Sequence, residues 1–380
     1  MTKDLEFKGY WFLPNNPNDK IAGTLYYQLN KEIRLELIGG FENISAKNLP
    51  FESAEIIHGI SQKAEEITLF NCNAYGSLNL SCGFPMTNFT CQFIIIGKHM
   101  STINDEIFNK IVVNLSSLFD WHPQGMIKQL IQFSNDRDFF ETQFSLSKSD
   151  YWEKEVSIDS NTKLKIHNIS GFNQSFDKRE TILTQDILCE IESVEKKSNF
   201  TDLLNKAGLF KQFLSFASLS SQEFLEIILF DNDNYQEFND GCRNIHPITL
   251  YYINKDIKIS DNKTSNFLFT YSDIEKIFPN IIKKWFDVKS EFAPIKNHLI
   301  ESLKRKKVFT SLDFLIIVQA LEGYHRRFVN KEIKLKRGES ELTLRLADLI
   351  SIYSDIDKIC NTKINLTHVV KSRNYYVSIR

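Results

Sequence analysis

The sequence has few cysteines, and none of them are closely paired. The six cysteines show no C-x-x-C spacing; they are Cys72, Cys82, Cys91, Cys189, Cys242 and Cys360. Zinc knuckles require such pairs, and small secreted proteins carry a denser set of disulfides. We therefore expect neither a zinc site nor a disulfide framework, and we expect a reducing, cytoplasmic location.

Glycine and proline are also scarce, with 14 and 8 residues among 380. These counts exclude a collagen-like or low-complexity chain. Phenylalanine is abundant, with 31 residues, and 42% of the chain is hydrophobic. So much apolar surface is costly to leave in water, so we expect a chain that is folded throughout and long enough for two domains.

Long apolar runs are absent. The longest ones, such as Phe93–Gly97 and Phe314–Val318, are far shorter than a membrane span. The N-terminus carries Asp4 and Glu6 and has no apolar core of secretory length. The sequence therefore predicts a soluble protein without a membrane partner.

Several catalytic signatures are missing as well. The chain has no Walker A loop, no G-x-S-x-G, no H-E-x-x-H and no G-x-G-x-x-G. The spacing E-x-x-H, which di-iron bundles use twice, occurs at Glu55–His58 and at Glu322–His325. The first lies among residues typical of a strand, so the two cannot share one helical bundle. We expect no metal site and no cofactor.

Charge is unevenly distributed along the chain. Residues 276–380 contain 21 Lys and Arg against 11 Asp and Glu, whereas residues 1–275 contain 25 against 37. The net charges are therefore +10 and −12, although the whole chain carries only −2. A basic region of this kind attracts polyanions, although solvated helix faces would give the same count.

The acidic part, residues 1–275, has a sequence pattern typical of a β protein. Short alternating apolar runs are separated by Gly, Asn and Asp, as in the hairpin Thr24–Leu29 and Ile33–Ile38 that ends at Gly39. Further predicted strands are Glu66–Cys72, Ser77–Cys82, Phe89–Ile96, Ile111–Leu115, Val156–Ile158, Leu164–Ile169, Glu180–Thr184, Ile187–Ile191, Phe224–Phe230 and Thr249–Ile253. Strands at this spacing indicate an antiparallel sandwich or barrel.

Helical periodicity appears once within the β region and then dominates the C-terminal part. Thr201–Leu219 has a broad apolar face and is predicted to pack on the sheet. The later helices are expected from Ser272 to Trp285 with a kink at Pro279, over Leu312–Phe328 with a cap at Thr310 or Ser311, over Glu341–Tyr353, and from Ile364 to the end. We place the domain boundary near 265–275. The predicted fold class is α+β, with a β-rich domain at 1–270 and a helical bundle at 271–380.

The order of several short segments resembles a known family. They are Gly9–Pro14, Gly23–Leu25, Leu35–Gly39, Phe213–Ala217, Ala320–Arg327, Leu344–Leu346 and Arg373-Asn374. In this order they resemble the ApeA-type anti-phage proteins, in which a β-rich N-terminal domain precedes a HEPN ribonuclease domain. The resemblance implies abortive-infection defence through metal-independent cleavage of RNA, tRNA included. It also implies a homodimer, because HEPN sites are built where two such domains pair, and a trigger derived from the phage.

HEPN ribonucleases carry an Arg followed after four to six residues by a His. The His acts as acid or base near neutral pH, and the Arg stabilises charge on the phosphate. Arg373 and Asn374 match this motif, but Ser378 occupies the His position. Serine is a poor base unless another group activates it. The resemblance therefore implies a weakened catalytic site and a helical domain truncated at its C-terminus, unless His325 or His368 substitutes.

Basic residues of the same region are candidates for RNA contacts. They are Lys304, Arg305, Lys306, Lys307, Arg326, Arg327 and Lys371, with Glu322, His325 and Arg345 as accessory positions. Glu322 and His325 also fit an ordinary helix-face pair, and His368 fits a packing residue. Two further hypotheses stay open. One is a non-catalytic HEPN module that dimerises and binds RNA or a partner, and the other is a two-domain protein with no nucleic-acid role.

Overall fold

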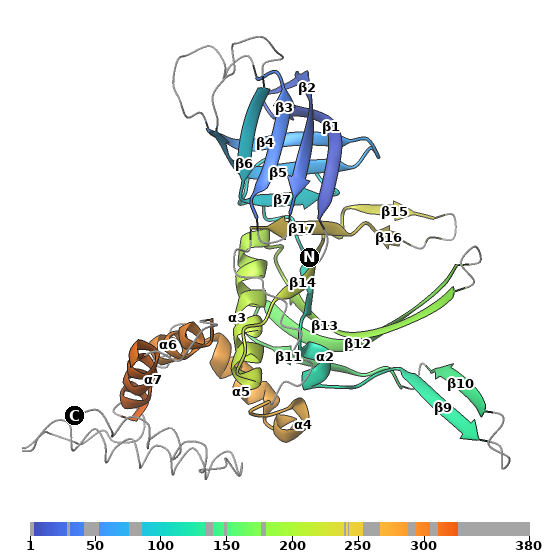
Figure 1. Cartoon of the computed structure of the whole chain (residues 1–380), viewed down its shortest axis with the longest axis vertical. Coiled ribbons are helices and arrows are strands. Elements are labelled where there is room, and N and C mark those ends of the chain that lie inside the picture. The colour runs from blue at the N-terminus through green and yellow to red at the C-terminus, as the bar shows by residue number, and fades with distance from the viewer. Residues whose placement is uncertain are drawn as a thin grey trace, which may run out of the picture. The chain divides into compact units, whose positions relative to one another are not determined.

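Alternation of apolar and polar residues organises the first part of the chain into antiparallel strands (Figure 1). The computed structural model describes residues 4–28, 31–41, 53–75, 86–133, 140–147, 150–175, 180–238, 241, 243–253, 267–287, 293–304 and 311–325. The chain divides into two compact units, Met1–Phe286 and Asp287–Arg380, which we call unit 1 and unit 2.

Six strands of unit 1 close into a barrel. They are β1 (Leu5–Leu13), β2 (Asn16–Tyr27), β3 (Ile33–Ile38), β4 (Ser53–Ser61), β5 (Glu66–Tyr75) and β6 (Met86–Cys91). Neighbouring strands follow the order β5-β4-β1-β2-β3-β6, and β6 pairs again with β5. The predicted hairpin is confirmed, because Gly23 lies opposite Leu37 and Tyr27 opposite Ile33 in the β2–β3 pair. Of the predicted sandwich or barrel, the structure forms the barrel.

The barrel interior is filled by inward-facing apolar side chains. Along β3, Ile33, Leu35 and Leu37 are fully buried, whereas Arg34 is exposed and Glu36 half-buried. Trp11 of β1 is also fully buried, and a Cβ at Gly59 of β4 would collide with its indole ring. The glycine at position 59 therefore makes room for the largest side chain of the barrel core.

The barrel continues into an open antiparallel sheet through β5. The first half of β5 pairs with β7 (Phe93–Ile96), while its last residues pair with β6. The predicted single strand Phe89–Ile96 is thus divided at Gln92, whose backbone N–H donates to the Phe70 carbonyl oxygen. The sheet then proceeds through β17 (Ile248–Tyr252), β14 (Phe224–Phe230), β8 (Lys110–Leu115), β13 (Glu180–Ser193), β12 (Thr162–Ser175) and β11 (Glu153–Ser157).

Helix α3 (Phe200–Ser218) packs against this open sheet (Figure 1). Asn199 caps it by accepting a hydrogen bond from the Asp202 N–H, and Leu219 ends it in the left-handed conformation with φ of 49°. The helix contacts β8 and β13, and its residues Leu203, Ala207, Phe210 and Leu214 are fully buried. The predicted helix over Thr201–Leu219 is confirmed.

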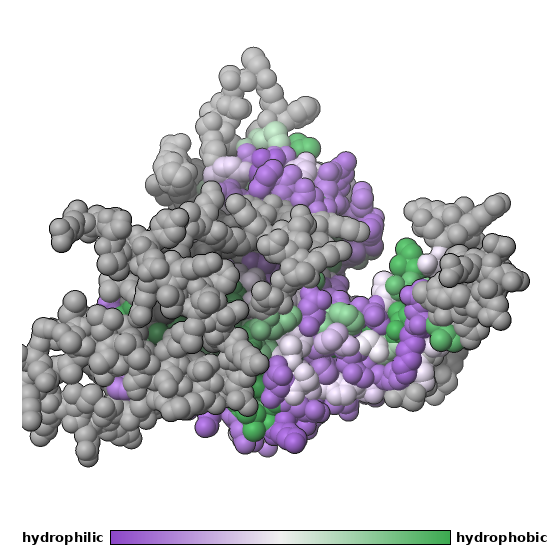
Figure 2. Space-filling model, turned by 60° about the horizontal axis from the view of Figure 1, so that its bottom comes forward, coloured by the Kyte–Doolittle hydropathy of each residue, from purple (hydrophilic) through white to green (hydrophobic). Residues whose placement is uncertain are grey.

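Two short hairpins and a small helix complete the β-rich part. The hairpins are β9 (Ile127–Phe133) with β10 (Phe140–Leu146), and β15 (Tyr235–Glu237) with β16 (Arg243–Ile245), and the helix is α2 (Leu118–Trp121). Figure 2 shows hydrophobic residues next to hydrophilic ones on the surface of the molecule.

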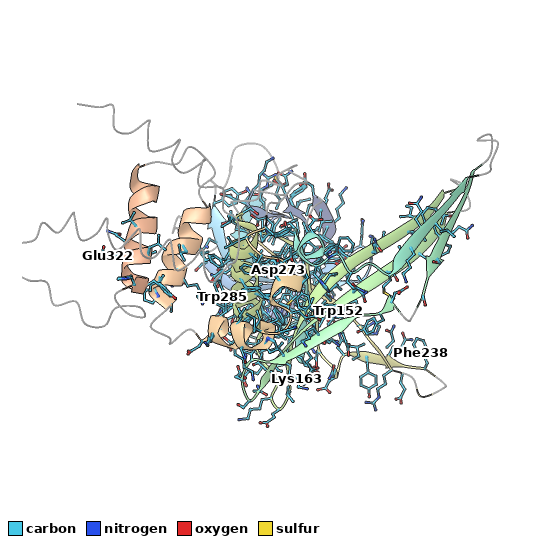
Figure 3. All side chains as sticks on the ribbon, turned by 90° about the horizontal axis from the view of Figure 1, so that it is seen from below. Trp152, Lys163, Phe238, Asp273, Trp285 and Glu322 are labelled. Carbon is cyan, nitrogen blue, oxygen red and sulfur yellow. The ribbon has the colours of Figure 1, made fainter. Side chains whose placement is uncertain are left out.

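Unit 1 ends with two helices rather than the predicted single helix from Ser272 to Trp285. The capping box of α4 (Tyr271–Ile274) is formed by Thr270 and Asp273. Pro279 lies in the first turn of α5 (Phe278–Phe286), where a missing N–H costs no helical hydrogen bond, so it starts a helix instead of kinking one. The Trp285 indole N–H donates to the Leu209 carbonyl oxygen of α3 at 2.8 Å. The Trp285 side chain is labelled in Figure 3. Helices α4 and α5 thus belong to unit 1, which ends at Phe286.

The described part of unit 2 is a pair of helices, α6 (Ala293–Lys304) and α7 (Ser311–Tyr324). They pack together, and a Cβ at Gly323 would lie 3.6 Å from the Ile295 side chain. Helix α7 overlaps the predicted helix Leu312–Phe328. The predicted helices Glu341–Tyr353 and Ile364 to the end, and the predicted strand Ser77–Cys82, lie outside the described residues.

Candidate functional site

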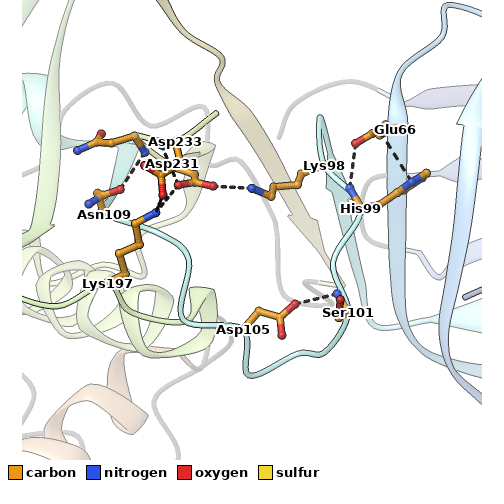
Figure 4. Close-up of polar contacts among 10 residues, drawn as sticks. Glu66, Lys98, His99, Ser101, Asp105, Asn109, Lys197, Asp231 and Asp233 are labelled. Atoms are coloured by element: carbon orange, nitrogen blue, oxygen red, sulfur yellow. Dashed lines mark hydrogen bonds and ion pairs between the residues drawn. The ribbon is translucent and has the colours of Figure 1, made fainter. Parts of the chain in front are cut away.

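A buried carboxylate joins the barrel side of unit 1 to the open sheet (Figure 4). Asp231 follows β14, and its side chain is only 2% exposed. Its two oxygens accept hydrogen bonds from Lys98 at 2.5 Å and from Lys197 at 2.8 Å. Lys197 also donates to the exposed Asp233 at 2.6 Å. Burial alone would raise the pKa of Asp231, but the lysine hydrogen bonds outweigh it and lower that pKa.

The segment that leads from β7 to β8 is held by further side-chain hydrogen bonds (Figure 4). Asp105 accepts from the Ser101 and Thr102 N–H groups at 2.7 and 3.0 Å. Asn109 accepts from the Asn232 N–H at 2.8 Å, next to Asp231. These contacts and the Asp231 ion pairs fix the connection between barrel and sheet. Their chemistry is that of a structural junction.

Two histidines stack beside this junction, at the end of the barrel. The rings of His58 on β4 and His99 after β7 are parallel to within 11°, with centroids 4.4 Å apart. Phe12 contacts both rings edge-on, at 5.8 and 5.6 Å. The backbone N–H of His99 donates to Glu66 at 3.1 Å, and its Nδ1 lies 4.0 Å from the other Glu66 oxygen. His58, His99 and Glu66 thus bring three titratable side chains together beside the junction.

The hydrogen bonds of the two histidines show which ring nitrogen of each carries a hydrogen. His58 Nε2 lies 2.9 Å from the Met100 carbonyl oxygen, and His99 Nε2 lies 2.9 Å from the Gly59 carbonyl oxygen. A carbonyl only accepts, so each Nε2 carries the hydrogen. Burial lowers the pKa of His58, as does the neighbouring His99, against the opposing hydrogen bond to Met100. His58 therefore favours its uncharged state and responds to acidification.

An aromatic cluster forms a second group of interest, where α2 meets α4. His122 lies 4.2 Å from Trp152 and 4.3 Å from Tyr271, measured between ring centroids. Burial lowers the pKa of His122 and raises that of Tyr271 to about 12. His122 Nε2 and the Tyr271 hydroxyl have no hydrogen-bond partner among the described residues. The contacts between the rings make this cluster chiefly a packing centre, since Trp121 and Phe278 also contact Tyr271.

These histidines were not assigned any function from the sequence. His58 and His99 are 41 residues apart, and only the strand pairs β4–β5 and β5–β7 bring them together. The sequence signal around them is the E-x-x-H spacing at Glu55–His58, which lies on β4 as expected for a strand. Among the described residues, no group of three or more His, Cys, Asp and Glu side chains could hold a metal ion.

Few of the predicted RNA-site residues fall within the described structure. Lys304 is the last residue of α6, Glu322 lies near the end of α7, and His325 follows α7 and is only 4% exposed. The others lie outside the described residues, so their roles stay predictions; they are Arg305, Lys306, Lys307, Arg326, Arg327, Arg345, Lys371, Arg373, Asn374 and Ser378.

Unit 2 contains one further buried charge. Lys296 of α6 is 3% exposed, and burial lowers its pKa although Asp287 acts in the opposite direction. Lys296 and His325 are therefore both buried basic groups of this unit.

No helix of the described residues is long and apolar enough to cross a membrane.

Comparison with known proteins identifies the larger part of the chain. Residues 6–285 match the family model described as ApeA N-terminal domain 1. No curated protein and no solved structure shows significant similarity to the chain. The matched region begins in β1 and ends in α5, so it comprises the barrel, the open sheet and the helices packed on it. The chain belongs to the ApeA N-terminal domain 1 family.

Proposed function

We propose that this protein acts in anti-phage defence, with unit 1 sensing infection and the C-terminal region acting on RNA. The observation that carries the proposal is the family match over residues 6–285. Defence of the abortive-infection type requires a sensor and an effector. Unit 1 would be the sensor, and it would respond to a trigger derived from the phage.

The distribution of charge supports these separate roles of unit 1 and the C-terminal region. Residues 1–275 carry −12, which disfavours contact with nucleic acid, whereas residues 276–380 carry +10. RNA, tRNA included, would therefore bind the C-terminal region. Lys304 to Lys307, Arg326, Arg327 and Lys371 would contact phosphates there, with Glu322, His325 and Arg345 as accessory positions.

The proposed effector is a HEPN-type endoribonuclease in the C-terminal region of a homodimer. Arg373 would stabilise charge on the phosphate during attack by the RNA 2′-hydroxyl, and Asn374 would orient that phosphate. Ser378 occupies the position where the family's His acts as acid or base. Serine titrates far from neutral pH, so we expect slow cleavage that needs no metal ion.

Ser378 also favours a second candidate function, an RNA-binding or partner-binding module that dimerises without cutting. Both functions require the basic residues, so binding and its salt dependence do not separate them. RNA cleavage separates the two functions, because only a ribonuclease would need Arg373 for more than RNA binding.

The defence role is tested by phage plating on cells that express the chain. The proposal predicts fewer plaques than on cells with an empty vector, loss of protection with Arg373→Ala, and stronger protection with Ser378→His. Arg337→Ala is the matched control, because it removes an arginine of the same region that has no assigned role. Equal plating of a phage panel on all strains, with the protein expressed and folded, would contradict the proposal.

A further inference from the structure

Strands β12 and β13 form a ribbon that extends well beyond its neighbours. They pair continuously from Thr162 opposite Ser193 to Ser175 opposite Glu180. Strand β11 reaches only His167 of β12, and β8 reaches only Leu188 of β13. In the part of the chain that the structure describes, residues 169–175 and 180–186 thus pair only with each other. We call this segment the free ribbon.

Apolar side chains are exposed on both faces of the free ribbon. Phe172 and Leu183 lie opposite each other and are 63% and 36% exposed. Ile169 and Ile182 lie on the other face and are 38% and 50% exposed. A two-stranded ribbon is at best marginally stable in water, whereas three or more strands with an apolar face are stable. The free ribbon therefore gains stability if further strands join it.

The edge of the free ribbon lacks the usual protection against pairing. Natural proteins guard exposed edges with charged residues, especially Lys, with Pro, or by keeping the edge strand short. Residues 169–174 of β12 and 181–185 of β13 contain no charged residue and no proline. This edge is thus open to pairing with another strand.

One of the two edges is better placed for this pairing. On the β13 side, Gln185 accepts a hydrogen bond from the Ile127 N–H at 3.0 Å, so the start of β9 approaches that edge. On the β12 side, the last flanking contact is the Asn168 N–H donating to the Trp152 carbonyl oxygen at 3.1 Å. Beyond Asn168, the β12 edge has no strand beside it among the described residues.

We propose that the β12 edge of the free ribbon binds the same edge of a second copy of this chain. A two-fold axis normal to the ribbon at Phe172 sets residues 170–174 antiparallel to the same residues of the second copy, so that Ser170 of one copy lies opposite Gln174 of the other. In such a symmetric pair, any charged residue of the segment would lie close to the same charge in the second copy, and the two would repel each other. Residues 170–174 contain no charged residue, so this repulsion does not arise. The result is a four-stranded sheet in which Phe172 and Leu183 of both copies share one apolar face.

Photo-crosslinking of the full chain tests the proposal. The photo-reactive residue p-benzoylphenylalanine replaces Phe172 in one protein and Tyr10 in the control. Tyr10 is 58% exposed but lies on β1 of the barrel. We expect a covalent dimer from position 172, in at least about fivefold higher yield than from position 10, with cross-linked peptides that contain β12 residues of both copies. Monomer only, intramolecular products only, or equal yields at the two positions would overturn the proposal.

Edge charges provide a second measurement. Ser170→Lys with Gln174→Lys places like charges opposite each other across the proposed pair, at positions that are half-buried and exposed in the single chain. If the double variant melts at the same temperature as the parent protein, we expect it to lose the covalent dimer formed from position 172. The control Tyr10→Lys should still form that dimer. Persistence of the dimer in the double variant would overturn the proposal. Neither result depends on RNA cleavage, so failure of the ribbon contact and failure of the proposed nuclease are distinguishable.

Discussion

Gly59 lies where any side chain would enter the space filled by the indole of Trp11. The two residues come from the neighbouring strands β4 and β1 and are opposite each other in the register. The interior of the barrel is thus packed around one tryptophan, and the backbone at position 59 is part of its wall.

Substituting Gly59 by Ala should destabilise unit 1. The added methyl group would displace the fully buried Trp11, and such overpacking costs about 1–3 kcal/mol. The free energy of unfolding is measured by denaturant titration followed through tryptophan fluorescence. Gly208→Ala is the matched control, because nothing lies within 4 Å of its Cβ position in α3 and alanine favours a helix. Equal stability of Gly59→Ala and wild type would contradict the packing described for the barrel.

Asp231→Asn should weaken the connection between barrel and sheet. It removes the charge that Lys98 and Lys197 both contact, and removing one partner of a buried pair costs about 3–5 kcal/mol. The two lysine side chains are 28% and 29% exposed, so solvent will reduce the loss to about 2–4 kcal/mol. Denaturant unfolding measures this difference.

Asp233→Asn serves as the control for that variant. The Asp233 side chain is 80% exposed, and its ion pair with Lys197 should contribute less than about 1 kcal/mol. If both variants lose the same stability, the Asp231 cluster does not fix the junction.

Acidification should destabilise unit 1 through its half-buried histidines. The pKa of His58 is lowered in the folded protein, so below the unfolded value of about 6.5 the unfolded chain binds a proton that the folded chain resists. Stability should therefore fall as the pH drops below about 6.5, and His122 and His167, whose pKa values are also lowered by burial, contribute in the same direction.

His58→Gln isolates the contribution of this histidine. Glutamine keeps an N–H donor for the Met100 carbonyl oxygen but does not titrate. The decrease in melting temperature between pH 7.5 and 5.5 should be smaller than in wild type, in the direction that linkage requires. His246→Gln, at an exposed position, should leave that decrease unchanged. If the melting temperature of His58→Gln falls as much as that of wild type, His58 does not contribute to the acid destabilisation.

Elements whose pattern is local were predictable from the sequence. The β2–β3 hairpin, β14 and helix α3 each follow from an uninterrupted alternation or helical period. Strand β13 was expected as two strands, Glu180–Thr184 and Ile187–Ile191. Gln185 and Asp186 instead continue the strand, where Gln185 is exposed and Asp186 accepts a hydrogen bond from the Asn114 amide at 2.6 Å.

Closure of the barrel and the histidine pair could not be predicted in the same way. Closure depends on the pairing of Asn73 with Thr90, and the histidine pair on a stack between residues 58 and 99. Neither leaves a local pattern, because the contacts depend on the register of strands that are distant in the sequence. The barrel strand β1 was missed because Gly9 interrupts its apolar alternation, and only the part of β4 around Glu55–His58 was recognised as strand-like.

We propose that this ApeA family member acts on RNA through Arg373 and that Ser378 limits its activity. The most direct measurement incubates the purified wild-type, Arg373→Ala and Ser378→His proteins with tRNA and total RNA in the presence of EDTA. We predict slow cleavage by the wild type, none by Arg373→Ala, and at least about tenfold faster cleavage by Ser378→His, as expected from a general base worth 10²–10⁴-fold when well placed. Intact RNA with a folded, dimeric Ser378→His protein would contradict the account.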